Sequence, residues 1–212
     1  PFAIQLYGAR PEAMAAAAQA AVEAGANLVD INAGCPARKV TRSFGGSYLL
    51  KDPLLLERIL RAVRRAVDVP VTVKIRSGYD EPALNFLEIG RMAEDCGVDA
   101  ITLHPRTRAQ MFTGRADWDH IRRLKESLRI PVIGNGDVVA PEDTPAMFAA
   151  TGCDAVMIGR GLMKNPWLIR QSCDLLERGG YDPVPTGVLL DLLARTAAVV
   201  AEQAAAKAVA GE

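Results

Sequence analysis

The sequence lacks any excess of charge and any long apolar run. Its 25 lysines and arginines balance 25 aspartates and glutamates, so the formal net charge is zero. A neutral chain offers no global attraction to nucleic acid or to a membrane surface, and any such attraction must come from local clusters of charge. No apolar run reaches the roughly 20 residues that a membrane-spanning helix needs, and we expect no membrane partner.

Paired cysteines and a dinucleotide fingerprint are also missing. The cysteines stand far apart and form no Cys-x-x-Cys pair, which argues against a zinc cluster and a small disulfide scaffold: they are Cys35, Cys96, Cys153 and Cys173. We expect no metal, and thiols in the reduced state of a cytoplasmic protein. No Gly-x-Gly-x-x-Gly segment follows the first predicted strand, which argues against a doubly wound dinucleotide-binding fold.

What is present is a regular alternation of predicted strands and helices. Short apolar, β-branched runs predict strands over residues 2–6, 28–33, 71–76, 100–104, 131–135 and 155–159. Helical segments lie between them, over residues 11–24, 54–67, 86–96, 118–128 and 141–150. Prolines stand near three helix starts and glycines follow three helix ends, namely Pro11, Pro53 and Pro141, and Gly25, Gly97 and Gly152.

Strands that alternate with helices predict a parallel sheet with right-handed crossovers. The α/β fold favoured here is a (β/α)8 TIM barrel. Six strands are two short of eight, and the chain opens on an apolar strand pattern without a starting methionine. We therefore expect residues 1–180 to form a fragment with six of the eight strands. Beyond a Tyr-Asp-Pro-Val-Pro linker, residues 187–212 are predicted to form a separate helix that starts a C-terminal helical region.

Alternation within the strands predicts which side chains face the barrel axis. Side chains two residues apart share a face, so the apolar set of strand 71–76 packs against the helices and Lys74 and Arg76 turn inward. The same reasoning turns Gln5, Asn32 and His104 inward, each near the C-terminal end of its strand. That end of a barrel carries the active site.

The inward lysine indicates a ligand. A buried ammonium group is costly unless an anionic or electron-rich group meets it. An internal salt bridge between Lys74 and Asp30 is the alternative, since buried ion pairs do occur. Because polar side chains converge from four strands, we expect a ligand rather than an isolated ion pair.

The loops after the last two predicted strands indicate a phosphate site. Asn135, Gly136 and Asp137 follow the fifth strand, while Gly159 and Arg160 follow the sixth. Barrels often bind phosphate at their last two loops, with glycine N–H groups as donors. We expect Arg160, which stands between two glycines, to bind an anion.

One cysteine lies where chemistry is expected. Cys35 follows strand 28–33 in a long, glycine-flanked loop, on the same face as the predicted ligand site. A buried structural thiol is the usual role of a free cysteine, and it suits Cys96 and Cys153 at helix ends. Cys35 is better placed to act as a nucleophile or general acid.

Basic residues gather in two loops on this face. One loop follows Cys35 and carries no acidic residue, and the other follows His104 and includes Phe112; the basic residues are Arg38, Lys39 and Arg42, and Arg106, Arg108 and Arg115. Ordinary solvated arginines are the alternative for either loop alone. A cationic rim around a ligand site suits a polyanion whose base is delivered into the site, so we expect a nucleic acid partner.

At this point the sequence resembles a known family. Asp-Ile-Asn-Ala-Gly-Cys-Pro at 30–36, running into Lys-Val at 39–40 and Gly-Ser-Tyr-Leu-Leu at 46–50, is similar to the catalytic-loop motif of tRNA-dihydrouridine synthases. Four later segments resemble that family's motifs in the same order: Lys-Ile-Arg at 74–76, His-Pro-Arg-Thr-Arg at 104–108, Gly-Asn-Gly-Asp at 134–137 and Met-Ile-Gly-Arg-Gly at 157–161. The resemblance covers nearly all of residues 1–178 and is greatest to the bacterial B-type branch.

The resemblance implies a flavoenzyme. FMN would be the cofactor and NADPH the reductant, a hydride would pass to carbon 6 of a tRNA uridine, and Cys35 would protonate carbon 5. Matching motif positions assign FMN contacts to Gln5, Lys74, His104, Asn135, Gly136, Asp137, Gly159 and Arg160. Asn32 and Arg76 match positions that hold the flipped uracil, and Arg106 matches a position that contacts RNA or the flavin phosphate.

The sequence departs from the family pattern at its ends. The Pro-Met-Ala-Gly strand that lies against the flavin and the strand after it are not seen before residue 1, so we expect this chain alone to bind FMN poorly. Two other functions stay open: a dihydroorotate dehydrogenase-like flavoprotein that acts on a free pyrimidine, and an RNA-binding barrel without redox turnover. The basic loops argue against a small free substrate. We expect a monomer.

Overall fold

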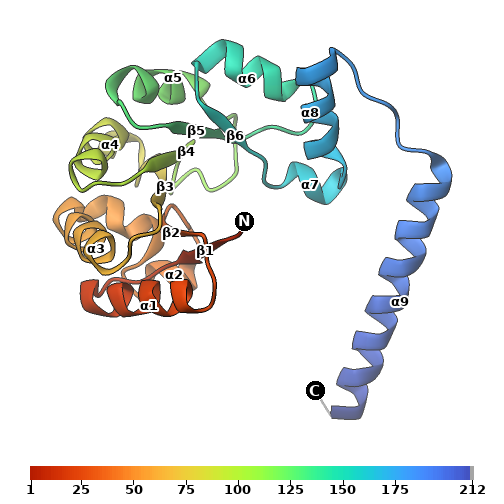
Figure 1. The fold of residues 1–212 in the computed structure, drawn as a ribbon, viewed down its shortest axis with the longest axis horizontal. Helices are drawn as coiled ribbons and strands as arrows, with labels where there is room; N and C mark the ends of the chain where they lie inside the picture. The colour runs from red at the N-terminus through yellow and green to blue at the C-terminus, as the bar shows by residue number, and fades with distance from the viewer. Residues whose placement is uncertain (211–212) are drawn as a thin grey trace.

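The computed structural model describes the backbone of residues 1–210 and the side chains as far as residue 205. Its strands form one parallel sheet in sequence order: β1 (Ala3–Leu6), β2 (Leu28–Ala33), β3 (Val71–Gly78), β4 (Ala100–Thr107), β5 (Val132–Asn135) and β6 (Ala155–Met157). The sheet curls into an open arc with helices along its outer side (Figure 1). The predicted fold class, six strands of a (β/α)8 barrel, is confirmed.

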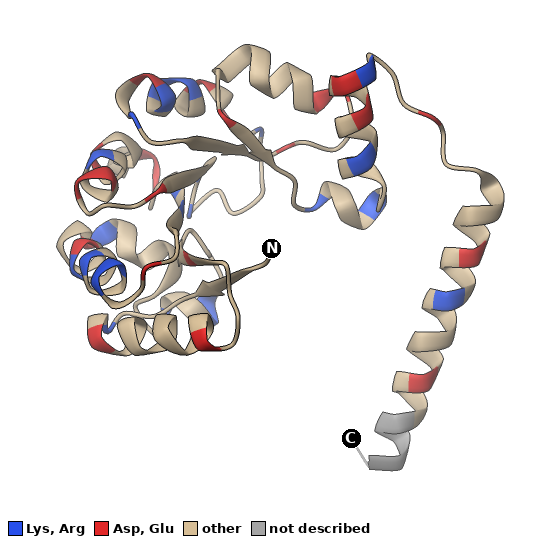
Figure 2. Cartoon of the chain, in the orientation of Figure 1, with Lys and Arg blue, Asp and Glu red and all other residues tan. Residues whose placement is uncertain are grey.

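The helices form the outer layer of this arc. The longer ones that cover the sheet are α1 (Pro11–Glu23), α3 (Pro53–Ala66), α4 (Phe86–Asp95), α5 (Trp118–Ser127) and α6 (Asp143–Thr151), and α8 (Leu168–Arg178) packs against α6 and α7. The region expected as a long loop after β2 contains α2 (Arg38–Thr41) and the 3-10 helix η1 (Gly46–Lys51); the remaining short elements are η2 (Glu81–Ala83) and α7 (Gly161–Lys164). Charged residues lie mostly on the helices and are sparse on the strands (Figure 2).

The last helix stands apart from the barrel. Helix α9 (Thr186–Ala210) follows an extended linker and runs away from the arc (Figure 1). Its start agrees with the predicted helix to within one residue. Among the residues that the structure describes, no helix combines the length and apolar character needed to cross a bilayer.

Local sequence signals explain several helix ends. Pro53 occupies the first turn of α3, and the Asp52 carboxylate accepts a hydrogen bond of 3.0 Å from the Leu55 N–H. This capping satisfies one of the N–H groups that a helix start leaves unpaired. Gly152 ends α6 with a φ of 65°, as predicted. The prediction that α6 begins near Pro141 was early by two residues.

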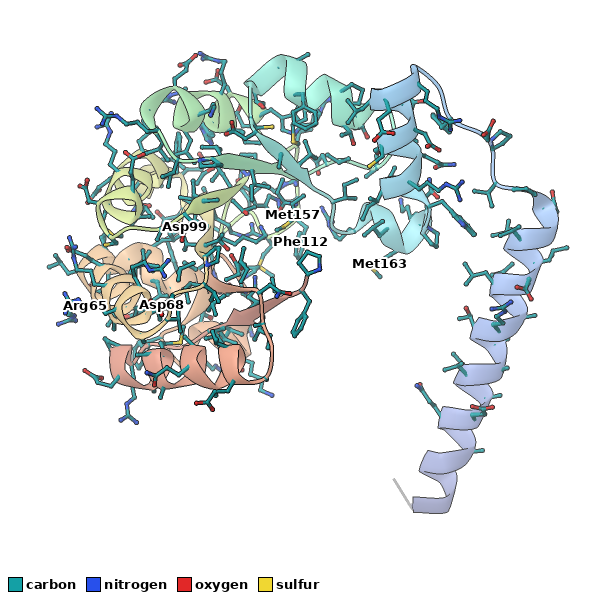
Figure 3. All side chains as sticks on the ribbon, viewed as in Figure 1. Arg65, Asp68, Asp99, Phe112, Met157 and Met163 are labelled. Atoms are coloured by element: carbon teal, nitrogen blue, oxygen red, sulfur yellow. The ribbon has the colours of Figure 1, made fainter. Side chains whose placement is uncertain are left out.

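The main core lies between the strands and the outer helices. Val71, Val73 and Ile75 are fully buried there, and their β4 neighbours Ile101 and Leu103 are buried beside them. Apolar residues therefore face the helices, as the alternation predicted, and the polar residues between them face the inside of the arc. Figure 3 shows Phe112 and Met157 within the arc, whereas Arg65 and Asp68 lie at its outer rim.

Strand β5 follows the same rule, although its sequence pattern left its orientation open. Gly134 is the residue that faces the helices, and a Cβ there would lie 2.6 Å from Met147 Sδ. A side chain larger than glycine does not fit between β5 and α6. Ile133 and Asn135 consequently turn toward the inside of the arc.

Candidate active site

A cavity of about 830 Å³ opens at the C-terminal ends of the strands. This volume is in the range of cofactor and small-molecule sites. Every predicted site residue except Arg106 lines it, namely Gln5, Asn32, Cys35, Lys74, Arg76, His104, Asn135, Gly136, Asp137, Gly159 and Arg160. The strands thus bring together residues that are up to 155 positions apart in the sequence, from Gln5 to Arg160.

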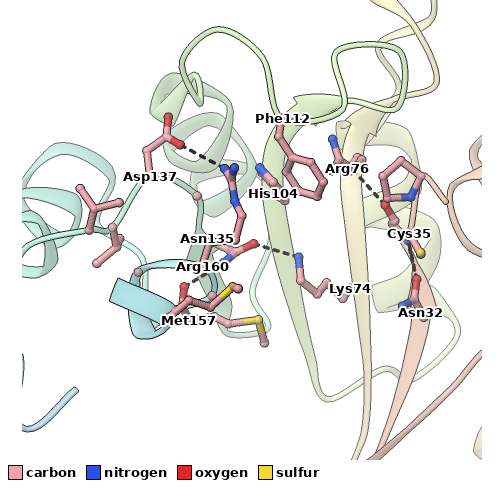
Figure 4. Close-up of a pocket in the computed structure, with 18 of the residues that line it drawn as sticks. Asn32, Cys35, Lys74, Arg76, His104, Phe112, Asn135, Asp137, Met157 and Arg160 are labelled. Carbon is pink, nitrogen blue, oxygen red and sulfur yellow. Dashed lines mark hydrogen bonds and ion pairs between the residues drawn. The ribbon is translucent and has the colours of Figure 1, made fainter. Parts of the chain in front are cut away.

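Lys74 and Asn135 are hydrogen-bonded to each other in the lining of this cavity (Figure 4). The Lys74 Nζ donates to Asn135 Oδ1 at 2.9 Å, and Asn135 Nδ2 donates to the Met157 carbonyl at 2.8 Å. The alternative of a Lys74–Asp30 salt bridge is not formed, because Asp30 instead accepts hydrogen bonds from Gln5 and Thr72, each at 2.6 Å. Burial, together with the nearby positive charge of Arg76, lowers the pKa of Lys74 to about 8.

Asn32 holds the start of the cysteine loop. Its Oδ1 accepts hydrogen bonds from the N–H groups of Gly34 (3.1 Å) and Cys35 (2.9 Å), and its Nδ2 donates to Gln5 Oε1 at 2.8 Å. Most of the hydrogen-bonding capacity of the Asn32 amide is therefore used inside the protein. These hydrogen bonds hold the Cys35 N–H end of the loop against β2.

The far side of the cysteine loop is fixed as well. Both the N–H and the hydroxyl of Ser47 donate to the Cys35 carbonyl, at 3.0 and 2.9 Å. Gly46 adopts a φ of 59°, and a Cβ there would lie 2.7 Å from the same carbonyl oxygen. The loop is therefore held at both ends, with the half-buried thiol of Cys35 at the cavity.

Arg76 connects the cysteine loop to the loop after β4. It is 2 % exposed, its Nε donates to the Gly34 carbonyl at 2.9 Å, and its Nη1 donates to the carbonyls of Thr107 and Met111. Burial and the nearby Arg106 lower the pKa of Arg76 to about 10. The guanidinium still carries its charge at neutral pH and contributes to a positive potential in the cavity.

His104 and Arg106 form a buried pair beside the cavity. Arg106 makes two hydrogen bonds of 2.8 Å to the Asp137 carboxylate, and its Nη1 lies 3.3 Å from His104 Nε2. Burial would raise the pKa of Asp137, but the hydrogen bonds from Arg106 and the Ala116 N–H outweigh it and lower that pKa. Arg106 does not line the main cavity, and its predicted contact with RNA or a flavin phosphate stays a prediction.

Phe112 is a cavity residue that sequence reasoning noticed but did not assign to the site. Its ring centroid lies 4.4 Å from the Arg160 guanidinium carbon and 5.4 Å from that of Arg76. The ring is 46 % exposed and also lies 6.3 Å from the His104 ring. Phe112 therefore forms an aromatic wall between two cations, a contact that its place among basic residues in the sequence could have indicated.

The two basic loops differ in how free their charges are. Arg38, Lys39 and Arg42 are exposed, and Arg115 is exposed in the second loop. Arg108 is half-buried, with its guanidinium 5.3 Å from the Tyr79 ring. The first loop therefore offers the more accessible cluster of positive charge. In the described part of the chain, no group of three or more His, Cys, Asp or Glu side chains is arranged to hold a metal ion.

Comparison with known proteins identifies the family of this chain. The family model for dihydrouridine synthases matches residues 1–208. The chain belongs to the dihydrouridine synthase family. It is 49 % identical over 191 residues to tRNA-dihydrouridine synthase B of Serratia marcescens. The aligned region covers 90 % of this chain and 57 % of the relative. It is also 49 % identical over 176 residues to the protein of that name from Pasteurella multocida, covering 83 % and 53 %.

The chain thus spans a little over half the length of these curated dihydrouridine synthases. Among solved structures, a D-glucarate dehydratase from Agrobacterium tumefaciens complexed with magnesium has a TM-score of 0.53 and 21 % sequence identity. The match covers 71 % of this chain and 35 % of that one. At this identity the likeness reflects the barrel fold alone.

Proposed function

We propose that this member of the dihydrouridine synthase family reduces specific uridines of tRNA to 5,6-dihydrouridine with FMN as cofactor and NADPH as reductant. The observation that carries the proposal is one cavity in which a thiol loop faces a lysine, a histidine and an asparagine. Two relatives that share 49 % sequence identity with this chain are named tRNA-dihydrouridine synthase B, which supports the same activity.

The residues present fit a flavin. A cavity of about 830 Å³ is large enough for an isoalloxazine ring, and it offers the Lys74 ammonium and the His104 imidazole to the electron-rich ring edge. Arg160 is exposed at the mouth. Apart from the adjacent residues in the chain, no atom lies within 4 Å of the position that a Gly159 Cβ would take, which leaves room for a phosphate. Gln5, Asn135, Gly136 and Asp137 would complete the FMN site. When bound, FMN would supply the hydride that carbon 6 of the uridine receives.

Cys35 is proposed as the general acid. Its loop is fixed by Asn32 on one side and Ser47 on the other, so the thiol holds a constant position at the cavity. The Cys35 proton would pass to carbon 5 of the uridine as carbon 6 gains the hydride, and solvent would reprotonate the thiolate. The positive charge of Arg76, which hydrogen-bonds the Gly34 carbonyl, would stabilise that thiolate.

Phe112 and Arg76 are proposed to hold the extruded base together with Asn32. An aromatic face at the mouth offers stacking to a base that has left its helix, a contact worth about 1–3 kcal/mol. The exposed Arg38, Lys39 and Arg42 would bind the phosphates of the surrounding RNA. Residues 1–180 would form the FMN-binding catalytic domain, and residues 187–212 would begin a helical RNA-binding region. We further propose a cytoplasmic monomer.

The test is genetic and chemical. In a strain that lacks the gene, mass spectrometry of bulk tRNA is expected to show loss of dihydrouridine, and the native gene should restore it. Cys35→Ala should leave flavin content near the native level and fail to restore dihydrouridine. Cys173→Ala, which removes an exposed thiol on α8, is the matched control and should restore it fully.

Two outcomes would replace this proposal. Unchanged dihydrouridine in the deletion strain would favour a dihydroorotate dehydrogenase-like enzyme that acts on a free pyrimidine. Full restoration by Cys35→Ala would eliminate the acid role of Cys35. Unchanged dihydrouridine in the deletion strain, together with purified protein that carries no flavin, would favour an RNA-binding barrel without turnover.

A further inference from the structure

The contact between Arg106 and His104 determines where the imidazole carries its proton. Arg106 Nη1 lies 3.3 Å from His104 Nε2. A guanidinium has only hydrogen-bond donors and keeps its charge at all accessible pH values. The Nε2 atom must therefore accept through its lone pair, which leaves a neutral ring with its proton on Nδ1.

Arg106 is itself held rigidly. It is 2 % exposed, and both of its terminal nitrogens bond the Asp137 carboxylate at 2.8 Å. Its other donors reach the carbonyls of Thr113 (3.0 Å) and Gly114 (2.6 Å) in the loop after β4. Bidentate pairs of this kind fix orientation as well as charge. The guanidinium cannot easily swing away from His104.

The surrounding charges also favour the neutral ring. Lys74 and Arg76 on β3, Arg106 on β4 and Arg160 after β6 are cationic groups near His104, and burial together with these cations lowers the pKa of His104 to about 3. The Asp137 carboxylate, which lies between Arg106 and Arg160, is engaged by Arg106. Protonation of His104 would place one more positive charge among four.

We propose that Arg106 is a positioning residue that, held by Asp137, keeps His104 as the neutral Nδ1–H tautomer and so directs a hydrogen-bond donor into the cavity. Nδ1 makes no hydrogen bond to any described residue, while His104 lines the cavity. The donor suits a carbonyl oxygen or ring nitrogen of an electron-rich heterocycle. The identity of that heterocycle as flavin or uracil rests on the proposed function; the tautomer itself does not.

A simpler role for Arg106 is to anchor the loop that carries Phe112, through the Thr113 and Gly114 carbonyls. The two roles differ in their effect on His104. Loss of an anchor alone would move the loop and leave the imidazole neutral with the same tautomer. Loss of the donor to Nε2 would change the protonation of His104 even where the loop stays in place.

The chain contains only two histidines, so the imidazole nitrogens can be assigned directly by 15N NMR. In the native protein His104 is expected as a single Nδ1–H tautomer that does not titrate between pH 5 and 8. His120, whose Nδ1 lies 2.8 Å from Ser77 Oγ, serves as the internal reference. A native His104 that carries its proton on Nε2, or that titrates in this range, would overturn the proposal.

Arg106→Met is the decisive variant. Without the donor and its charge, the midpoint of the His104 titration is expected to rise above about 3, because one of the surrounding cations is removed while burial, Arg76 and Lys74 still lower that pKa. The Nε2–H tautomer should also become detectable. The Trp118 indole, which donates to the Gly136 carbonyl at 3.0 Å, reports whether this region keeps its fold. Arg115→Met removes an exposed arginine of the same loop and should leave His104 unchanged.

A milder variant covers the case in which Arg106→Met does not fold. Asp137→Asn keeps the shape of the partner and the charge of Arg106, so His104 should stay neutral while some Nε2–H tautomer becomes detectable. An unchanged single tautomer in both variants would assign Arg106 to loop anchoring only. Because these spectra need no turnover, a failure of the dihydrouridine assay would refute the proposed function and leave this inference standing.

Discussion

Replacing Lys74 with methionine tests whether the buried positive charge of Lys74 lowers the stability of the folded chain. The folded pKa of Lys74 is about 8, compared with an ordinary value of 10.5. One pKa unit corresponds to about 1.4 kcal/mol, so burying the protonated amine costs the folded chain about 3 kcal/mol at most. Water in the open cavity reduces this figure, and methionine also loses the hydrogen bond to Asn135, worth about 1 kcal/mol.

The sign of the effect follows from proton counts. Below about pH 8 Lys74 is protonated in the folded and the unfolded chain, and the full cost applies. Between pH 8 and 10.5 the unfolded chain holds more protons than the folded one, so native stability rises with pH. Lys74→Met should therefore stabilise the chain by about 1–2 kcal/mol at pH 7 and lose that advantage near pH 10.5.

Urea unfolding of both proteins at pH 7 and near pH 10.5 measures this difference in stability. The contributions of the other titrating groups are shared by the two proteins and cancel in the difference. Lys39→Met, which removes an exposed lysine on α2, controls for the loss of one positive charge. A stability difference that stays the same at the two pH values, or a methionine variant that is less stable at pH 7, would show that burial does not penalise the Lys74 charge. A buried charge that destabilises the free protein is expected at a position where a bound ligand interacts favourably with that charge.

Three further predictions concern single residues. Gly136→Ala should lower the free energy of unfolding by about 1–3 kcal/mol, because Gly136 has a φ of 114° and an added Cβ would lie 3.2 Å from His104 Cδ2. The control, Gly159→Ala, adds a Cβ in open space and should lower that free energy by under about 0.5 kcal/mol. Asp52→Ala should lower Tm by about 2–4 °C by removing the cap of α3, and an unchanged Tm would contradict the capping. Phe112→Ala should reduce kcat/KM for tRNA about tenfold, with Phe112→Tyr restoring it; equal values for all three proteins would exclude stacking.

Much of the site was predictable because strand geometry is periodic. Side chains alternate in any strand, so Gln5, Lys74 and His104 had to share a face once their apolar neighbours were assigned to the helices. Parallel strands also end at the same edge, and this brought Asn135 and Gly159 to the same cavity. Glycines after helix ends predicted left-handed caps for the same local reason.

The pairings within the site could not be predicted in this way. Lys74 could have met Asp30 or Asn135, and only the relative placement of β2, β3 and β5 made the second contact while Gln5 and Thr72 took the Asp30 carboxylate. The strand pattern also did not indicate that the Asn32 amide hydrogen-bonds Gln5 and the Cys35 loop. Such choices depend on distances between strands, which periodicity does not contain.

By itself, then, the sequence determined the βα order, the inward face of each regular strand and the end of the barrel where Cys35 lies. Tertiary structure alone decided that Arg106 is buried against Asp137 and His104 instead of lining the cavity, and that the Phe112 ring lies between two guanidiniums. The physical reason is the distance along the sequence over which each feature is determined. Backbone geometry repeats from residue to residue along a strand, whereas an ion pair or a ring contact depends on packing between segments that are distant in the chain.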